Sequence, residues 1–214
     1  MYDIAIIGAG INGSAVAYEL RDERKNIALF DMGGIASGGS GAAGAFISPK
    51  FSKAGELKEL LHEAFVYSLA FYKEHFAHLL EEAQLLHLAQ DAKDAEILEV
   101  YKASSPLELL SVAGESREYI SINAGLVDAQ LICKAMAKYA ELKKKEVTSL
   151  VYDDGVWIIN ETYSAKEVVL ATGAYKKLIE EPYIQLRGVW GHRIDIETST
   201  KNPYSIHQFV SISP

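Results

Sequence analysis

Residues 3–13 read Asp3-Ile4-Ala5-Ile6-Ile7-Gly8-Ala9-Gly10-Ile11-Asn12-Gly13. The first five residues form a short apolar run, which is typical of a strand that is buried on both faces of a parallel sheet. Three glycines follow with the spacing Gly-x-Gly-x-x-Gly, and small residues and helix formers continue the chain as far as residue 20. The stretch therefore predicts a strand, a tight turn and a helix.

A second apolar run completes a βαβ unit, because Ile27-Ala28-Leu29-Phe30 follows the helix and ends at Asp31. Gly8 permits the tight turn, Gly10 lets the backbone approach a pyrophosphate, and Gly13 allows the helix to pack closely on the strand. An acidic residue at the end of the second strand accepts hydrogen bonds from an adenosine ribose and disfavours NADP. The unit predicts a dinucleotide site without separating FAD from NAD.

Two later segments favour FAD. Residues 33–45, rich in Gly, Ala and Ser, directly follow the second strand, where such a loop lets the backbone approach a ligand closely. Residues 167–174 read Glu167-Val168-Val169-Leu170-Ala171-Thr172-Gly173-Ala174, an apolar strand that ends in a turn of small residues. With residues 8–13, these segments resemble the D-amino-acid-oxidase-like (DAO) superfamily of FAD-dependent oxidoreductases.

The resemblance implies a set of residues that contact FAD. They come from the first turn, the end of the second strand, the Ser/Gly loop, the return turn, and a strand near residue 147 that touches the adenine through its backbone in that superfamily. The implied contacts are Gly8, Ala9, Gly10, Ile11, Asn12, Gly13, Asp31, Met32, Ser37, Gly38, Ser40, Gly41, Ala43, Gly44, Val147, Ala171, Thr172 and Gly173.

A narrower likeness rests on two segments. Residues 36–49 and 186–192 resemble the FAD domain of the bifunctional tRNA wobble-uridine modification proteins (MnmC). The chain departs from that domain at two places. Ala42-Ala43 stands where the MnmC domain carries polar residues, and residues 125–127 lack the tryptophan of that domain. A free amino acid oxidase or dehydrogenase therefore stays open as the alternative.

The implied fold is α/β, with a Rossmann-like FAD-binding domain built on a parallel sheet and interleaved with a smaller α+β substrate domain. We expect residues 1–50 and 125–185 in the FAD-binding domain, and residues 51–124 and 186–214 in an incomplete substrate domain. Members of the superfamily continue past the position of Pro214, so we expect the chain to be truncated, to bind FAD weakly and to self-associate through an incomplete sheet.

The sequence also predicts elements outside these motifs. Apolar spacing predicts a long helix over 56–83, and a helix over 129–142 follows Asp128. Asp-Gly between β-rich runs predicts a hairpin of 146–152 and 156–160. Further strands are expected at 85–89, at 119–122 with a turn at 123–125, at 189–197 and at 206–212, and a further helix from residue 91 to residue 101.

The resemblance implies an enzyme that oxidises a C–H next to an amine nitrogen and leaves an imine for water to hydrolyse, with FAD carrying the redox chemistry. The substrate is either carboxymethylaminomethyl-uridine at the tRNA wobble position, which loses its carboxymethyl group, or free glycine, sarcosine or a D-amino acid. Lys50 and His192 are candidate catalytic residues. The alternative interpretations are that Lys50 is an exposed loop lysine and that His192 is a strand residue with a structural role. An inactive nucleotide-binding fragment is the remaining alternative.

Charge and composition limit the partners. A net charge of −8 argues against tight, sequence-independent binding to nucleic acid or an anionic membrane, so a nucleic-acid partner is expected only in a full-length protein. Cys133 is the single cysteine, and its apolar neighbours favour a buried thiol. His75 and His78 have no third ligand nearby, so we expect no metal. The lack of a signal peptide or apolar span predicts a cytoplasmic protein.

Overall fold

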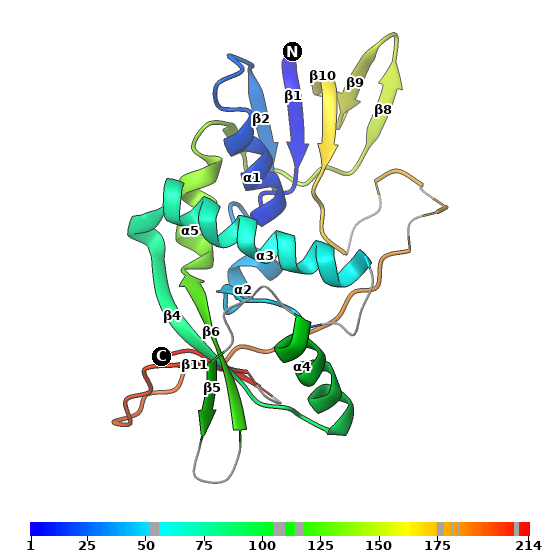
Figure 1. Ribbon diagram of the computed structural model, residues 1–214. Coiled ribbons are helices and arrows are strands. Elements are labelled where there is room, and N and C mark those ends of the chain that lie inside the picture. The colour runs from blue at the N-terminus through cyan, green and yellow to red at the C-terminus, as the bar shows by residue number, and fades with distance from the viewer. Residues whose placement is uncertain are drawn as a thin grey trace. The chain divides into compact units, whose positions relative to one another are not determined.

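The computed structural model describes residues 1–51, 56–104, 110–113, 118–174, 178–180, 182–183, 185–207 and 210–214. These form two compact units, each built from two separate segments of the chain (Figure 1): Met1–Ala43 with Ala129–Ile194, and Gly44–Asp128 with Asp195–Pro214. Residues 186–194 join the first unit, although the sequence suggested the second. The assignment of the units to FAD and to substrate stays a prediction.

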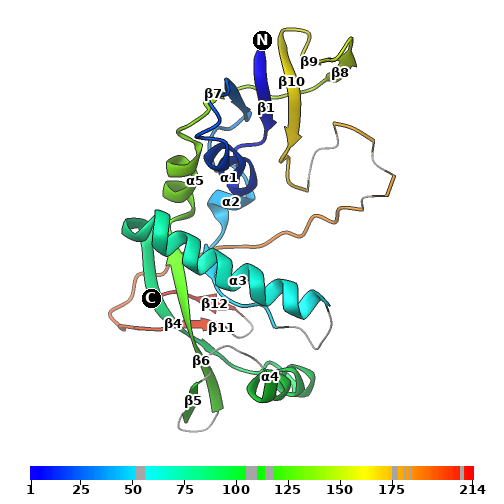
Figure 2. The ribbon, with the colours of Figure 1, turned by 45° about the horizontal axis from the view of Figure 1, so that its top comes forward.

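The first unit contains a six-stranded sheet with a parallel centre (Figure 2). Its strand order is β7-β2-β1-β10-β9-β8. The parallel strands are β7 (Glu141–Lys143), β2 (Ile27–Phe30), β1 (Tyr2–Ile7) and β10 (Tyr163–Leu170). An antiparallel pair, β9 (Val156–Ile159) and β8 (Leu150–Asp153), extends one edge. The predicted strand, turn, helix and strand thus form the centre of this unit.

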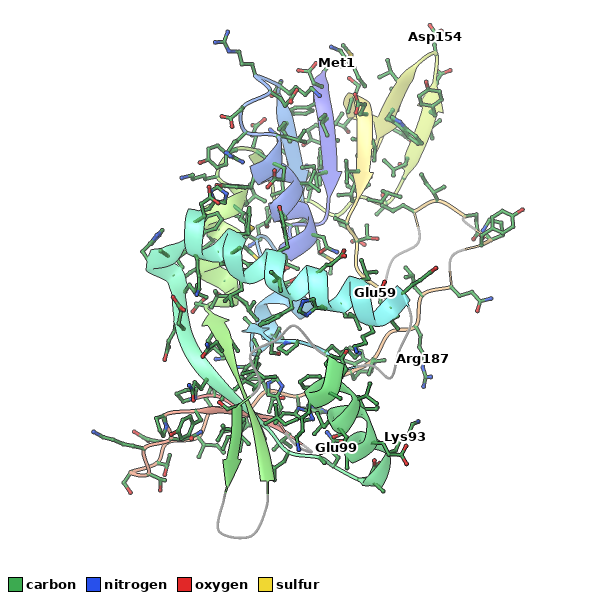
Figure 3. All side chains as sticks on the ribbon, viewed as in Figure 1. Met1, Glu59, Lys93, Glu99, Asp154 and Arg187 are labelled. Carbon is green, nitrogen blue, oxygen red and sulfur yellow. The ribbon has the colours of Figure 1, made fainter. Side chains whose placement is uncertain are left out.

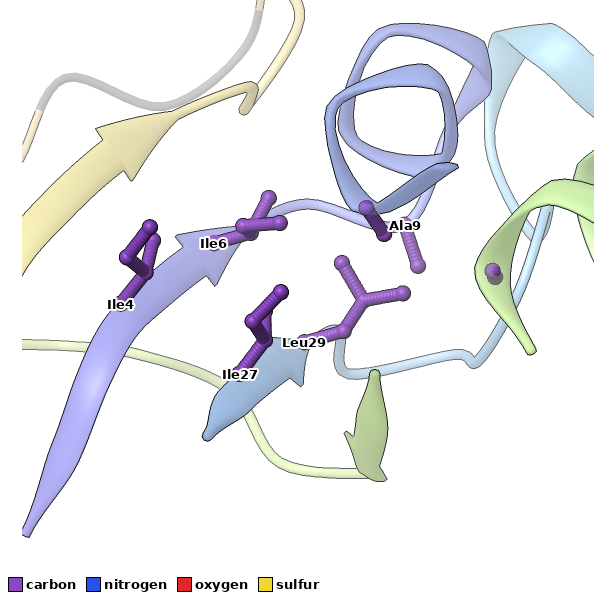
Figure 4. Close-up of a cluster of buried hydrophobic side chains, with 7 residues drawn as sticks. Ile4, Ile6, Ala9, Ile27 and Leu29 are labelled. Atoms are coloured by element: carbon purple, nitrogen blue, oxygen red, sulfur yellow. The ribbon is translucent and has the colours of Figure 1, made fainter. Parts of the chain in front are cut away.

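Both faces of β1 and β2 are buried, which explains their continuous apolar runs. One core includes Ala17 of α1 (Ile11–Glu19) and Ala137 of α5 (Ala129–Ala137), with Ile4, Ile6, Ala9, Ile27 and Leu29 (Figure 4). The other core consists of Ala5, Ile7, Ala28, Phe30, Val147, Ile159 and Ala165. Each fully buried Ile, Leu or Phe contributes about 1.5–3 kcal/mol by leaving water.

The predicted hairpin forms between β8 and β9 and turns at Asp154 and Gly155, with φ of 45° and 81° (Figure 3). Its first strand begins at residue 150 rather than 146. The reason is the side chain of Asn160, whose Oδ1 accepts hydrogen bonds from the Thr148 and Ser149 amides while its Nδ2 donates to the Glu146 carbonyl. These bonds hold residues 146–149 outside the ladder.

The second unit contains a six-stranded sheet in which β12-β11-β4-β6-β3 are neighbours in that order, with β5 pairing on β6. Its strands are β3 (Phe46–Ile47), β4 (Leu80–His87), β5 (Leu110–Ala113), β6 (Glu118–Val127), β11 (Ser205–His207) and β12 (Ser211–Ile212). Its helices are α3 (Glu56–His75), the short 3₁₀ helix η1 (Ala77–Leu79) and α4 (Ala92–Ser104).

Two predictions for the second unit were wrong, one for a helix and one for a turn. The helix predicted over 56–83 ends at His75, because residues 80–87 form β4 and pair with β6 along eight positions. The predicted turn at 123–125 is absent, since β6 runs straight to Val127. Gly125 instead allows close packing, because a Cβ there would lie 2.7 Å from Leu80 Cδ1.

The strand predicted at 189–197 was also wrong. Among the described residues of 185–204, none belongs to a strand, and the apolar side chains of Trp190 and Ile194 are 83% and 79% exposed. Alternating apolar residues favour a strand only where a neighbouring strand pairs with them. The helix predicted over 129–142 likewise ends at Ala137, because residues 141–143 form β7 beside β2.

Candidate dinucleotide-binding site

The turn between β1 and α1 is formed by backbone in close contact. Gly8 has a φ of 107°, and a Cβ on it would lie 2.2 Å from the Ala171 carbonyl oxygen. A Cβ on Gly13 would lie 1.9 Å from the Gly8 carbonyl oxygen. The Gly8 amide donates to the Phe30 carbonyl at 2.7 Å. Only glycine fits at these two positions, so the turn lies directly against the ends of both neighbouring strands.

The N-terminus of α1 is covered by a serine from a distant loop. Gly10 precedes the helix and offers no side chain to cap it, and the Ile11 amide donates to Ser40 Oγ at 3.0 Å. A Cβ on Gly10 would lie 2.9 Å from the same hydroxyl. Helix N-termini attract anions through their free amides and their dipole. Ser40 therefore marks the position at which a phosphate oxygen would meet α1.

Asp31 connects the first turn to the Ser/Gly loop. Its Oδ2 accepts a hydrogen bond from the Ala9 amide at 3.0 Å. Its Oδ1 accepts from the Gly33 amide at 2.9 Å, the Gly34 amide at 2.9 Å and the Ser37 hydroxyl at 3.0 Å. The carboxylate therefore holds the loop against the turn.

The loop itself is compact. Ala36 has a φ of 55°, and its amide donates to the Ala9 carbonyl at 2.9 Å. The four-residue helix α2 (Gly39–Ala42) follows, and a Cβ on Gly41 would lie 2.0 Å from the Ala36 carbonyl oxygen. Three links thus join the loop to residues 9–11: through Asp31, Ala36 and Ser40. The side chain of Met32, by contrast, is 70% exposed.

The end of β10 forms the third part of the site. The Ala171 amide donates to the Ile7 carbonyl at 2.8 Å, and its carbonyl carbon and oxygen lie against Gly8. Gly173 has a φ of 68°, which fits the predicted turn of small residues. Val147 is 4% exposed and belongs to the same buried core as Phe30.

This arrangement matches a known family. The family model described as "FAD dependent oxidoreductase" (DAO) matches residues 3–212. The chain belongs to the DAO family. FAD is the cofactor of this family, and its solved members share the Rossmann-like α/β fold of the present chain.

Several proteins are similar to this DAO-family chain. The bifunctional tRNA 5-methylaminomethyl-2-thiouridine biosynthesis protein MnmC of Acinetobacter baylyi is 26% identical over 185 residues, which cover 79% of this chain and 28% of that protein. Glycine oxidase of Geobacillus kaustophilus is 41% identical over 46 residues, covering 22% of this chain and 12% of that protein.

Solved structures agree on the fold. The crystal structure of Geobacillus kaustophilus glycine oxidase matches with a TM-score of 0.64 and 27% identity, over 81% of this chain and 56% of that one. An FAD-bound L-α-glycerophosphate oxidase from Mycoplasma pneumoniae matches with a TM-score of 0.66 and 20% identity. The chain spans about half the length of these solved relatives and less of the curated ones.

The structure brings together the predicted residues of the first turn, Asp31, Ser37, Ser40 and Ala171. Sequence reasoning missed Gly33, Gly34 and Ala36, whose backbone groups hold the loop in place. The signal was the Gly33-Gly34 pair, which begins two residues after Asp31 and supplies amides that can turn back to its carboxylate. Gly44 was placed with these residues but belongs to the second unit, where a Cβ on it would lie 2.6 Å from the Phe46 ring.

The two candidate catalytic residues lie outside this cluster. Lys50 follows β3 in the second unit with an exposed side chain, and His192 is exposed in the irregular segment of the first unit. Arg187 projects from the same segment (Figure 3). The catalytic roles of Lys50 and His192 stay predictions.

The remaining chemistry of the described residues is limited. Burial raises the pKa of the Cys133 thiol, and a hydrogen bond with Ser14 acts in the opposite direction. Cys133 packs in the interior as the sequence predicted. No group of three His, Cys, Asp or Glu side chains in the described part of the chain could hold a metal ion. Among the same residues, no helix has the length and apolar character needed to cross a bilayer.

Proposed function

We propose that the first unit binds FAD through its adenosine diphosphate half, and that the enzyme oxidises the C–H next to an amine nitrogen. The observation that carries the proposal is the joining of two glycine-rich segments by Asp31, Ala36 and Ser40. This arrangement leaves the N-terminus of α1 with no side chain of its own at Gly10. A bulky pyrophosphate requires such a position, because a side chain on Gly10 would take up the space in front of the helix N-terminus.

Different groups of the site would bind different parts of the cofactor. The amides of Gly10 and Asn12 would hold the pyrophosphate, together with the Ser40 hydroxyl that accepts from the Ile11 amide, because donors at a helix N-terminus stabilise negative charge. Asp31 would accept from the ribose, and the backbone of Val147 would contact the adenine. The return turn of Ala171, Thr172 and Gly173 would lie beside the same adenosine diphosphate half of the cofactor. The bound cofactor supplies the electron acceptor, and the protein orients the substrate.

The similar proteins support two classes of substrate. The similarity to MnmC over 79% of the chain supports carboxymethylaminomethyl-uridine in tRNA, which would lose its carboxymethyl group as glyoxylate. The similarity to glycine oxidase supports glycine, sarcosine or a D-amino acid. Both substrates carry a C–H between an amine nitrogen and a carboxylate, so one reaction serves both: oxidation to the imine, followed by hydrolysis. Lys50 and His192 would be tested as groups that attract the carboxylate.

Cofactor identity gives the first test. Because weak binding is expected, the protein is dialysed to equilibrium against FAD, FMN and NAD at equal concentrations, and the bound molecule is identified by mass; we expect FAD. Recovery of NAD or FMN alone would contradict the proposal. The matched variants are Gly8→Ala, whose new Cβ meets the Ala171 carbonyl, and Gly39→Ala, whose new Cβ meets nothing within 4 Å. FAD should be lost from the first and kept by the second.

Substrate class gives the second test. The FAD-loaded protein is mixed without oxygen with glycine, sarcosine, D-alanine or tRNA that carries carboxymethylaminomethyl-uridine. Loss of the flavin colour with one class identifies the substrate, and glyoxylate release checks the products from the tRNA, glycine or sarcosine. A protein that keeps FAD and responds to none of them would be a nucleotide-binding fragment without this activity.

A further inference from the structure

The side chain of Asn160 holds the backbone on both sides of Val147. Its Nδ2 donates a hydrogen bond to the Glu146 carbonyl at 2.7 Å, and its Oδ1 accepts one from the Thr148 amide at 2.8 Å. The Glu146 carbonyl and the Val147 amide belong to one peptide group, and the Val147 carbonyl and the Thr148 amide belong to the next. One side chain therefore fixes the orientation of both peptide groups of Val147.

These two bonds set the direction in which Val147 presents its own polar groups. Both peptides are trans, so the C=O and the N–H of each point in opposite directions. Because the Glu146 C=O and the Thr148 N–H point toward Asn160, the Val147 N–H and C=O both point away from it. Among the described residues, none forms a hydrogen bond with either of these groups. Val147 therefore presents a donor and an acceptor side by side, while its buried side chain anchors it in the core.

Asn160 is itself held by a tight turn between β9 and β10. The Thr162 amide closes this turn on the Ile159 carbonyl at 3.1 Å, and the Asn160 amide donates to the Ser149 carbonyl at 3.1 Å. The two central residues, Asn160 and Glu161, have φ of 50° and 55°, in the left-handed region that asparagine adopts more readily than most residues. The turn thus fixes the position from which the Asn160 side chain reaches the neighbouring loop.

We infer that Asn160 is a positioning residue that sets the selectivity of the site for adenine, although it does not touch the base. This inference rests on the proposed function, in which the Val147 backbone contacts the adenine of FAD. Adenine offers its N6 amino donor next to a ring-nitrogen acceptor, which match the carbonyl and the amide of Val147. Hypoxanthine carries an oxygen in place of the amino group, and this oxygen would meet the Val147 carbonyl oxygen. Selectivity therefore requires that both Val147 groups keep the direction that Asn160 gives them.

Calorimetric titration of the 214-residue chain with ADP and inosine diphosphate (IDP), which differ only in the base, tests the inference. The wild type should bind IDP about ten-fold or more weakly than ADP, as expected for a lost hydrogen bond and two opposed acceptors. Asn160→Gly removes the side chain, and glycine adopts the positive φ without strain. ADP should then bind several-fold more weakly and IDP about as before, so that the two differ by no more than about three-fold. Equal binding of ADP and IDP to the wild type would overturn the inference, and so would an unchanged ratio in Asn160→Gly.

Glu161→Gly is the matched control, because it places a glycine in the same turn at an exposed residue with nearly the same φ. It should keep the wild-type ratio of the two affinities. Hydrogen exchange at the Thr148 and Ser149 amides, measured without ligand, should become faster in Asn160→Gly and stay unchanged in Glu161→Gly. Loss of selectivity in both variants would show that the turn as a whole, and not the Asn160 side chain, positions Val147.

Asn160→Asp keeps the inference testable if Asn160→Gly does not fold. It retains the acceptor for the Thr148 amide but sets a carboxylate oxygen against the Glu146 carbonyl, so the preference for ADP over IDP should still fall. A wild-type preference in a folded Asn160→Asp protein would contradict the inference. If neither ADP nor FAD binds the wild-type chain, the proposed function itself fails. If both bind but ADP is not preferred over IDP, only the inference on Asn160 fails.

Discussion

At the residue scale, Gly13 leaves no room for any other side chain. A Cβ there would lie 1.9 Å from the Gly8 carbonyl oxygen and 3.2 Å from Ile6 Cγ2. Backbone cannot yield at this point without moving β1, which forms the centre of the sheet. The close packing of α1 on β1 therefore requires glycine at position 13, whether or not a nucleotide is bound.

Gly13→Ala should lower the free energy of unfolding by about 1–3 kcal/mol or more, the usual cost of overpacking a core. Urea denaturation measures this as a lower midpoint with an unchanged slope. Gly39→Ala, where the new Cβ meets nothing within 4 Å, is the control and should change the midpoint little. A Gly13→Ala protein as stable as the wild type would mean that α1 can move away from β1.

Asp31 should combine a structural role with a binding role. Asp31→Ala should weaken FAD binding by about 1–3 kcal/mol, and it should also destabilise the apo-protein because four donors lose their acceptor. Asp31→Asn keeps one carbonyl oxygen and should recover part of the stability. Titration of FAD and urea denaturation are measured on the same variants. Unchanged FAD affinity in a folded Asp31→Ala protein would show that the carboxylate does not reach the ribose.

At the scale of elements, the sequence predicted those whose signal is local. β1, α1, β2 and the β8–β9 hairpin each carry their own apolar run or turn chemistry, and all four were confirmed in position or nearly so. The misplaced elements depend on pairing over long distances. β4 takes residues from the predicted helix because β6 lies beside it, and residues 189–197 stay irregular because no described strand pairs with them.

In the candidate site, too, local sequence signals were predicted and contacts between distant residues were not. The glycines of the turn and Asp31 could be assigned from spacing alone, since each has a known physical task in a βαβ unit. The bonds of Ser37 and Ser40 could not, because they depend on where a loop of small residues folds back. Spacing places a residue near a ligand but does not tell whether its hydroxyl points to the ligand or to a neighbouring side chain.

The strand β11 carries a testable pH dependence. His207 faces His87 of β4 in register and packs edge-on against the Phe46 ring, and no described residue forms a hydrogen bond with its buried Nε2. His87 in turn lies 3.3 Å from the Asp94 carboxylate. Burial, and to a lesser degree the charge of His87, lowers the pKa of His207 below its ordinary value of 6.5. The folded chain therefore holds His207 neutral.

Because the folded state binds this proton less tightly than the unfolded state, stability should be present above the ordinary pKa and lost as the pH falls below about 6.5. Hydrogen exchange at Ser205–His207, measured from about pH 8 to about pH 5 and corrected for intrinsic rates, should show the loss. His207→Phe should remove much of it, whereas His78→Gln, at an exposed histidine, should not. Equal pH responses in the wild type and His207→Phe would contradict the assignment.

At the scale of the whole molecule, the two units divide the chain without dividing the candidate site. The turn, Asp31, the Ser/Gly loop as far as Ala43, and the end of β10 all belong to the first unit, which has a core on each face of its sheet. α2 and α5 also lie close together in this unit. Ala43 and Ala129 can therefore be joined by a short connection without crossing the sheet.

A chain of residues 1–43 joined to 129–194 by a short Gly/Ser linker should fold and bind ADP within about ten-fold of the 214-residue chain, since flexible linkers of this kind add little constraint. Calorimetry and circular dichroism measure the two properties. The same chain with Gly8→Ala is the control and should lose ADP. A folded linked chain that fails to bind ADP would place part of the adenosine site in the second unit.

The pairing of β1 with β10 also bears on how the protein is made. Asp3 and Lys166 form an ion pair across 163 residues of chain, and β1, which also pairs with β2, has its second parallel neighbour only when β10 is complete. At about 5–20 residues per second, a ribosome needs roughly ten to thirty seconds to reach that point. During this interval the nascent β1 exposes an apolar edge. Chaperone demand during translation should therefore peak before residue 170 emerges. Slower synthesis of the chain up to β10 would leave the edge of β1 exposed for longer.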